Sequence, residues 1–216
     1  MEIALLLYDE MAPLDAVGPY EVLRNVPGWK VRTVAKTAGE VRDERGTLGL
    51  LADHSLDEVR AADIVLAPGG RGSRVLMHDE ELLAWLREVD STTKWTTSVC
   101  TGALLLGAAG LLRGRRATSN WLLLDVLRDF GADPVGGRWV EDGKILTAAG
   151  VTAGIDMALH LVAREADPRV AQAVQLGLEY DPDPPFDCGS PDKAPAEIVE
   201  LVRRASSAGD PLLGPS

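Results

Sequence analysis

The sequence predicts an α/β fold: a doubly wound, mostly parallel sheet with helices on both faces. Short apolar runs alternate with helical patterns along the 216-residue chain, which is the order produced by strand–helix–strand units. One of these runs, 64–67, is apolar throughout, as expected for a strand covered on both faces of a parallel sheet. Hydrophobic residues make up 46% of the chain, which is enough for a full core.

The chain begins with an apolar run at 3–8 that ends at the turn-prone pair Asp9-Glu10. A helical pattern follows from Pro13 to Leu23, so this part predicts a strand, a loop and a helix. The elements predicted next are a strand at 31–35 and a more exposed strand pair at 41–51 that turns at 44–46.

The middle of the chain holds two strong strand patterns. The first ends in a Pro-Gly-Gly loop at 68–70, and the second, 95–99, ends at Cys100. Between them, 80–90 carries leucines on one helical face and charged residues on the other, as in a helix that covers a sheet. Small apolar residues at 102–112 predict a tightly packed interior helix. Cys100 is therefore expected at a strand-to-helix turn.

The remainder of the chain continues the alternation. The predicted elements are a strand at 117–119, a helix at 122–130, a hairpin of 139–142 with 144–147 through Asp142-Gly143, and helices at 154–163, 168–178 and 197–205. The stretch from 181 to 191, rich in Pro and Asp, is expected to be a packed surface loop. We expect a single domain over residues 1–205 and a C-terminal tail, 206–216, that frays.

Charge and cysteine content narrow the class of partner. The net charge is −11 and the 22 basic residues are dispersed, so a nucleic acid partner is not expected. Arg113, Arg115 and Arg116 cluster, but beside Gly114, which favours a solvated turn. The N-terminal apolar run is too short to span a bilayer and lacks the basic flank of a signal peptide. Two cysteines in unrelated contexts fit reduced thiols, so we expect a cytoplasmic protein with no membrane partner.

Cys100 is the candidate nucleophile. A thiol at a helix N-terminus is expected to have a lowered pKa, because unpaired amides stabilise the thiolate. Buried cysteines are more often inert small hydrophobes, and Cys188 keeps that interpretation. The context of Cys100 differs, because a strand precedes it and Thr101-Gly102 follow it, in the pattern of a nucleophile elbow.

Two further segments are expected at the same edge of the sheet, where ligands of such folds bind. Gly69 and Gly70 offer backbone amides for negative charge that develops during a reaction, or they form a simple turn. The amide of Thr101 is a second candidate donor, and its hydroxyl either donates as well or caps the helix. Asp15 is either a helix N-cap or a carboxyl that moves protons near the thiol.

The histidines do not fit a cysteine–histidine pair. His54 and His78 lie in polar, surface-like contexts, and His160 is embedded in a helical pattern. The chemistry is therefore expected to rely on Asp15.

Several motifs together resemble the ThiJ/PfpI superfamily, within the flavodoxin-like, class I glutamine amidotransferase-like fold. They are Leu14-Asp15-Ala16-Val17-Gly18-Pro19, Ala67-Pro68-Gly69-Gly70, Ser98-Val99-Cys100-Thr101-Gly102, Gly114-Arg115-Arg116-Ala117-Thr118 and Thr152-Ala153-Gly154-Ile155-Asp156. The segment 175–186 is similar to one found in the isonitrile hydratase (isocyanide hydratase) subgroup. Many relatives carry a glutamate against the cysteine and a histidine where this chain has Asn120, whereas isonitrile hydratases resemble this chain in using an aspartate.

The resemblance implies a carbon–nitrogen lyase that adds water to an isonitrile and forms an N-substituted formamide. Cys100 would form a thioimidate, and Asp15 would move protons and activate water. Thr101 and the amides near Gly70 would stabilise the intermediate, and Asn120 would shape the pocket or hold the Cys100 loop. The resemblance implies no metal, no organic cofactor and a homodimer.

Two other functions stay open at this stage. The first is a glyoxalase or deglycase on the same elbow, although its usual glutamate and histidine are missing. The second is a non-catalytic ligand-sensing domain like those of some transcription regulators of the superfamily. Such regulators carry a helix-turn-helix region, whereas only one helix is predicted after Pro191.

Overall fold

The computed structural model describes residues 1–208 of the chain. Contacts between Cα atoms divide the chain into two compact units, 1–179 and 180–216. The expected single domain over 1–205 stays a prediction.

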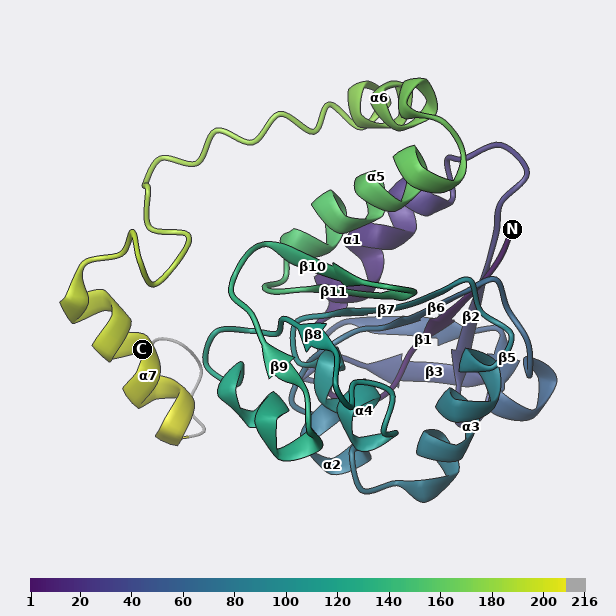
Figure 1. Ribbon diagram of the computed structural model, residues 1–216, viewed down its shortest axis with the longest axis horizontal. Coiled ribbons are helices and arrows are strands. Elements are labelled where there is room, and N and C mark those ends of the chain that lie inside the picture. The colour runs from purple at the N-terminus through teal and green to yellow at the C-terminus, as the bar shows by residue number, and fades with distance from the viewer. Residues whose placement is uncertain (209–216) are drawn as a thin grey trace. The chain divides into compact units, whose positions relative to one another are not determined.

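The first unit is built on a seven-stranded sheet (Figure 1). Its order is β10 (Trp139–Asp142), β11 (Ile145–Ala148), β7 (Trp95–Val99), β6 (Ile64–Ala67), β1 (Glu2–Leu6), β2 (Lys30–Ala35) and β5 (His54–Ser55). Only the pairing of β10 with β11 is antiparallel. The predicted fold class, a doubly wound and mostly parallel sheet, is confirmed.

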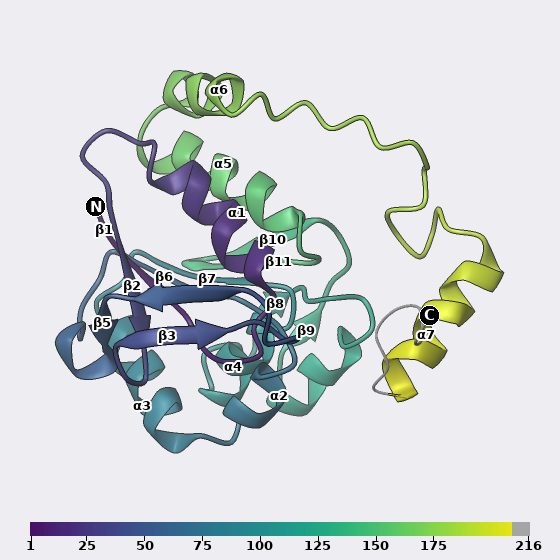
Figure 2. The same cartoon turned by 180° about the vertical axis from the view of Figure 1, so that it is seen from behind.

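Helices cover both faces of this sheet (Figures 1 and 2). One face carries α1 (Pro13–Leu23) and α5 (Ala153–Glu165), with α6 (Pro168–Gly177) packed on α5. The other face carries α2 (Ser73–Leu76), α3 (Glu80–Asp90), α4 (Gly102–Ala108) and the 3-10 helix η2 (Asp125–Phe130). Every residue of β6 and β7 is buried between these layers, as the unbroken apolar pattern of β6 predicts.

The direction of winding changes between β1 and β6. From β1 the chain moves to β2 on one side, and it then returns to β6 and β7 on the other side of β1. Ligands of open α/β sheets bind beyond the carboxyl ends of the strands at such a switch point. The segments that follow β1, β6 and β7 carry Asp15, Gly69-Gly70 and Cys100.

Three small elements complete the first unit. The hairpin of β3 (Gly39–Arg42) and β4 (Gly49–Ala52) confirms the predicted strand pair, and β8 (Arg116–Ala117) pairs with β9 (Asp133–Pro134). The 3-10 helix η1 (Leu56–Glu58) follows β5.

Two predicted helices are shorter than expected. The helix expected over 102–112 ends at Ala108, because Gly110 turns the chain with a φ of 82°. The helix expected over 122–130 is a 3-10 helix that begins at Asp125. There the Asn120 side-chain oxygen accepts a hydrogen bond from Leu122 N at 3.0 Å, which holds a turn in place of a first helical turn.

The second unit contains α7 (Ala196–Ala208), which confirms the last predicted helix. The stretch 181–191 has no helix or strand, and side chains 181–187 are exposed, so it is a surface loop but not a packed one. Its prolines and acidic residues give it little apolar surface to bury. Of the tail expected at 206–216, residues 206–208 belong to α7, and 209–216 lie outside the described residues. No helix within 1–208 is long and apolar enough to cross a membrane.

Candidate active site

Cys100 occupies a sharp turn between β7 and α4. Its φ of 55° is one of three positive values among non-glycine residues of the described chain, and such strain is typical of functional turns. The amide of Cys100 donates to the Ala148 carbonyl at 3.0 Å, which ties the turn to β11. A side chain at Gly102 would collide with the Ala67 and Pro68 carbonyls. The predicted strand-to-helix turn at Cys100 is present.

Asp15 lies in the first turn of α1 and is fully buried. It is not the N-cap, which is Ala12. Its Oδ2 atom accepts a hydrogen bond from Gly69 N at 2.9 Å, whereas Oδ1 is buried and has no hydrogen-bond partner. The N-cap alternative is therefore wrong. The carboxyl points into the core, toward the loop that follows β6.

Burial controls the ionisation of Asp15. Loss of solvent raises its pKa to about 7, against the opposing effects of the Gly69 amide and the Cys100 thiol. A carboxyl with this pKa can both accept and release a proton near neutral pH.

The Cys100 thiol and the Asp15 carboxyl lie close enough to perturb each other. Burial raises the pKa of Cys100, and the Asp15 charge raises it further, while the Thr101 amide and the Asn120 side chain lower it. The expectation of a lowered pKa is therefore wrong. Cys100 is only 7% exposed and faces a carboxyl. The resulting desolvation destabilises the thiolate by more than the amides at the start of the seven-residue helix α4 stabilise it. Burial and the Asp15 charge both favour the protonated thiol over the thiolate.

Thr101 connects the elbow to the glycine loop. Its hydroxyl oxygen accepts a hydrogen bond from Gly70 N at 2.9 Å and donates to the Gly70 carbonyl at 3.2 Å. It does not cap α4. Ser73, fully buried, places its hydroxyl 3.0 Å from the Thr101 oxygen and 2.7 Å from the Gly70 carbonyl.

The two glycine amides therefore bind protein groups. Gly69 N donates to Asp15 and Gly70 N to Thr101, so neither is vacant for an oxyanion here. A Cβ on Gly69 would lie 2.5 Å from Thr101 N and 2.8 Å from the Asp15 carboxylate. Glycine at position 69 thus lets the loop approach both groups. The amide that acts on the sulfur is that of Thr101.

Asn120 lies near the thiol, and its side chain lowers the pKa of Cys100. The turn at Leu122 described above orients this side chain. The neighbouring Ser119, 1% exposed, donates from its hydroxyl to the Cys100 carbonyl at 2.9 Å. The structure thus brings together Cys100, Asp15, Thr101, Gly69, Gly70 and Asn120, all predicted from the sequence.

Three further residues of the site are not among those predicted from the sequence. Tyr8 is buried and donates to the Pro68 carbonyl at 2.6 Å, and its pKa is raised by burial and then by the charge of Asp15. Ser73 and Ser119 hold Thr101 and the Cys100 backbone. Only Tyr8 could have been suspected, since it ends the apolar run at 3–8 that leads to Asp15.

The histidines take no part in these contacts. His160 binds Glu141 at 2.8 Å on β10, and its ring lies 5.6 Å from that of Trp139. Within 1–208 no three His, Cys, Asp or Glu side chains gather as metal ligands would.

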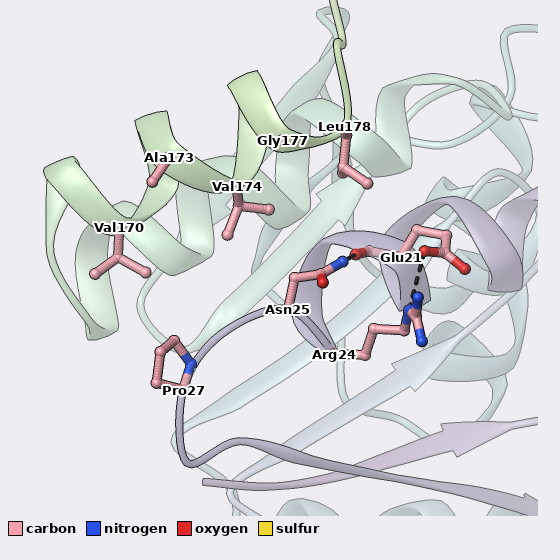
Figure 3. A pocket seen from close by; sticks show the side chains of 9 residues that line it. All are labelled: Glu21, Arg24, Asn25, Pro27, Val170, Ala173, Val174, Gly177 and Leu178. Atoms are coloured by element: carbon pink, nitrogen blue, oxygen red, sulfur yellow. Dashed lines mark hydrogen bonds and ion pairs between the residues drawn. The ribbon is translucent and has the colours of Figure 1, made fainter.

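Two cavities of the first unit are not lined by Cys100. One, of about 480 Å³, lies between the end of α1 and α6 (Figure 3). Figure 3 shows Val170 and Val174 pointing toward Asn25 and Pro27, while Arg24 is paired with Glu21 at 3.0 Å. The other, of about 870 Å³, is bordered by Tyr8, the β3 strand and α2. Neither has Cys100 or Asp15 in its lining.

The fold and the site together define a class: doubly wound α/β proteins with a cysteine elbow, here paired with a buried carboxyl. Within that class, a model of the DJ-1/PfpI family matches residues 1–164, and the chain belongs to this family. It is 43% identical to an isonitrile hydratase of Pseudomonas putida, over 96% of this chain and 90% of the relative.

Two further comparisons agree. A ThiJ/PfpI family protein from Pseudomonas syringae has a crystal structure that matches with a TM-score of 0.93 and 40% identity, over 96% of this chain and 86% of that one. Protein/nucleic acid deglycase 2 of Escherichia coli is 30% identical, over 61% of this chain and 78% of the relative. The resemblance found in the sequence motifs is confirmed.

Proposed function

We propose that the protein is an isonitrile hydratase that converts R–N≡C and water to R–NH–CHO. The observation that carries the proposal is the pairing of Cys100 with the buried carboxyl of Asp15, with no histidine in the site. The 43% identity to an isonitrile hydratase over nearly the whole chain supports it.

The first half-reaction forms the carbon–sulfur bond. Asp15 takes the proton of the Cys100 thiol, and the thiolate attacks the terminal carbon of the isonitrile. The triple bond becomes a double bond, and the carbon lone pair takes the proton back from Asp15, which leaves R–N=CH–S–Cys100. The Asp15 pKa of about 7 suits this exchange, because a carboxyl with that pKa can accept the thiol proton and release it again near neutral pH.

The second half-reaction adds water. Asp15 removes a proton from a water molecule while the water oxygen attacks the thioimidate carbon. Asp15 then passes that proton to the nitrogen, which gives R–NH–CH(OH)–S–Cys100. The hydroxyl proton then returns through Asp15 to sulfur as the carbon–sulfur bond breaks, which releases the formamide and the thiol. The Thr101 amide and the Asn120 side chain, which both lower the pKa of the Cys100 thiol, would stabilise the departing thiolate.

Gly69 and Gly70 act in this proposal mainly by holding Asp15 and Thr101. The Gly70 amide already donates to the Thr101 hydroxyl, so it would stabilise an oxyanion only by donating to both oxygens at once. The reaction uses no metal and no organic cofactor, and we propose a cytoplasmic homodimer, by resemblance to relatives.

A second candidate is a deglycase or glyoxalase reaction on the same cysteine. It is favoured by the 30% identity to a deglycase of Escherichia coli. Its usual glutamate and histidine are replaced here by Asp15 and Asn120, so it ranks below hydration.

The test is direct. Purified protein, treated with a chelator, is mixed with an alkyl or an aryl isonitrile, and the N-substituted formamide is followed by mass spectrometry. A parallel assay offers methylglyoxal. Formamide without methylglyoxal turnover supports the proposal, and methylglyoxal turnover without formamide overturns it in favour of the second candidate.

A further inference from the structure

The β3–β4 hairpin is fastened to the segment that leads from β1 to Asp15. Glu10 N donates to the Arg42 carbonyl at 2.7 Å, and Arg42 N donates to Asp9 Oδ1 at 2.8 Å. Met11 forms β-bridges both with Asp43, at the start of the hairpin turn, and with Gly70. The hairpin turn is therefore held at the same segment as the glycine loop.

The turn presents one carboxylate to the glycine loop. Asp43 shapes the turn, because its Oδ1 accepts from Thr47 N at 2.7 Å and from Leu48 N at 3.1 Å. Glu44, the next residue, accepts a hydrogen bond from Arg71 N at 2.8 Å. Arg71 directly follows Gly69-Gly70. The Glu44 carboxylate therefore holds one end of this loop, while Gly69 N at the other end donates to Asp15.

The charge of Glu44 also reaches the site. It raises the pKa of both Asp15 and Tyr8, although burial is the larger cause in each case. The ionisable groups that act on Asp15 or respond to its charge are Cys100, Tyr8 and Glu44, from three different elements. Because Glu44 is exposed, salt should screen its effect.

We propose that Glu44 is a positioning residue of the active site, whose carboxylate binds the Arg71 amide and so holds the 69–71 loop against Asp15. The negative charge of Glu44 also opposes the loss of the Asp15 proton. The mechanistic part rests on the proposed function, in which Asp15 moves protons. The electrostatic part concerns Asp15 alone.

Two variants separate the hydrogen bond from the charge. Glu44→Gln keeps an oxygen that can accept from Arg71 N but removes the charge, whereas Glu44→Ala removes both. Glu40→Gln is the matched control, since Glu40 lies on the same hairpin, pairs with Arg42 and does not act on Asp15.

The measurement is a pH titration of the Asp15 carboxyl by nuclear magnetic resonance in protein labelled at aspartate carboxyls, with Asp15→Asn used for assignment. Glu44→Gln and Glu44→Ala should lower the Asp15 pKa by roughly 0.3 to 0.5 unit at low salt. The shift should fade in molar salt, and Glu40→Gln should match the wild type. In the hydration assay, the carboxyl limb of the pH–rate profile should move likewise in both variants. The maximal rate on the plateau of the profile should fall only in Glu44→Ala, by roughly fivefold.

The proposal is overturned if Glu44→Gln titrates like the wild type at low salt, or if Glu40→Gln shifts Asp15 equally. It is also overturned if Glu44→Ala keeps the full rate. If the wild type hydrates no isonitrile, the proposed function fails, and the carboxyl titration, which needs no substrate, still decides the electrostatic part.

Discussion

The Thr101 hydroxyl and the Gly70 peptide form a reciprocal pair: Gly70 N donates to the hydroxyl oxygen at 2.9 Å, and the hydroxyl faces the Gly70 carbonyl at 3.2 Å. This pair joins the loop after β6 to the elbow after β7. Asp15 binds one residue earlier in the same loop, at Gly69 N. The position of the Asp15 carboxyl relative to the Cys100 thiol therefore depends in part on the Thr101 hydroxyl.

Thr101→Val should uncouple the loop from the elbow. Valine has nearly the shape of threonine but cannot accept from Gly70 N, and an unsatisfied amide in this partly buried site costs about 1–3 kcal/mol. We expect the free energy of unfolding to fall by that amount and most activity to be lost. Chemical denaturation and turnover of an isonitrile measure the two effects.

Thr101→Ser is the matched control for that variant. It keeps the hydroxyl and removes one methyl group, so it should lose under about 1 kcal/mol of stability and retain most activity. Equal damage in the serine and valine variants would mean that the methyl group, not the hydrogen bonds to Gly70, maintains the site.

Cys100→Ala should abolish turnover, whereas Cys188→Ala should retain most of it. Cys100 is buried at a strained turn against Asp15, while Cys188 lies in the irregular stretch before α7 and is partly exposed. Mass spectrometry after treatment with an isonitrile should find any covalent adduct on Cys100 alone. Equal losses of turnover in the two variants would contradict this division of the cysteines.

Asp15→Asn should inactivate the protein and yet stabilise it at neutral and alkaline pH. The pKa of Asp15 is raised from an ordinary value of about 3.9 to about 7 in the folded state, so the folded protein binds this proton more tightly than the unfolded chain. Its contribution to stability is therefore fully present below about pH 4 and is lost as the pH rises to about 7. Asparagine does not titrate, so it avoids a loss of the order of a few kcal/mol.

Thermal unfolding of the wild type and Asp15→Asn between pH 4 and pH 8 measures this effect. The advantage of the variant should grow with pH and level off above pH 7. An advantage that stays constant with pH would show that the Asp15 carboxyl does not titrate in this range.

The elements that the sequence predicts best are those with strong local signals. Pro13 opens α1, Asp79 caps α3 through Leu82 N at 3.2 Å, and 95–99 is buried throughout, so all three elements have the predicted bounds. Cys100 and Asp15 were predicted because parallel strands bring their carboxyl ends to one edge.

The site features that the sequence does not predict depend on contacts between segments that lie far apart in the chain. Ser119 reaches Cys100 across 19 residues, and Ser73 reaches Thr101 across 28. No periodicity marks such a partner, since a buried serine in a loop or at the start of a short helix looks like any turn or cap residue. The direction of the Cys100 pKa shift was missed for a related reason: it is set by burial and by the Asp15 carboxyl, neither of which can be weighed against a helix terminus before the packing is known.

Asn120→Asp should slow the reaction of the thiol while the local turn stays intact. An aspartate oxygen can still accept from Leu122 N, as the asparagine does at 3.0 Å. The amide donor that acts on the Cys100 sulfur is lost, however, and a negative charge replaces it, so the pKa of the thiol should rise further. Because removing one donor to a developing anion costs about 100-fold or more, kcat should fall by roughly that factor.

Alkylation of Cys100 by iodoacetamide, in the Cys188→Ala background, should slow in parallel, whereas the free energy of unfolding should stay close to that of the wild type. If Asn120→Asp is alkylated as fast as the wild type, the Asn120 side chain does not stabilise the thiolate.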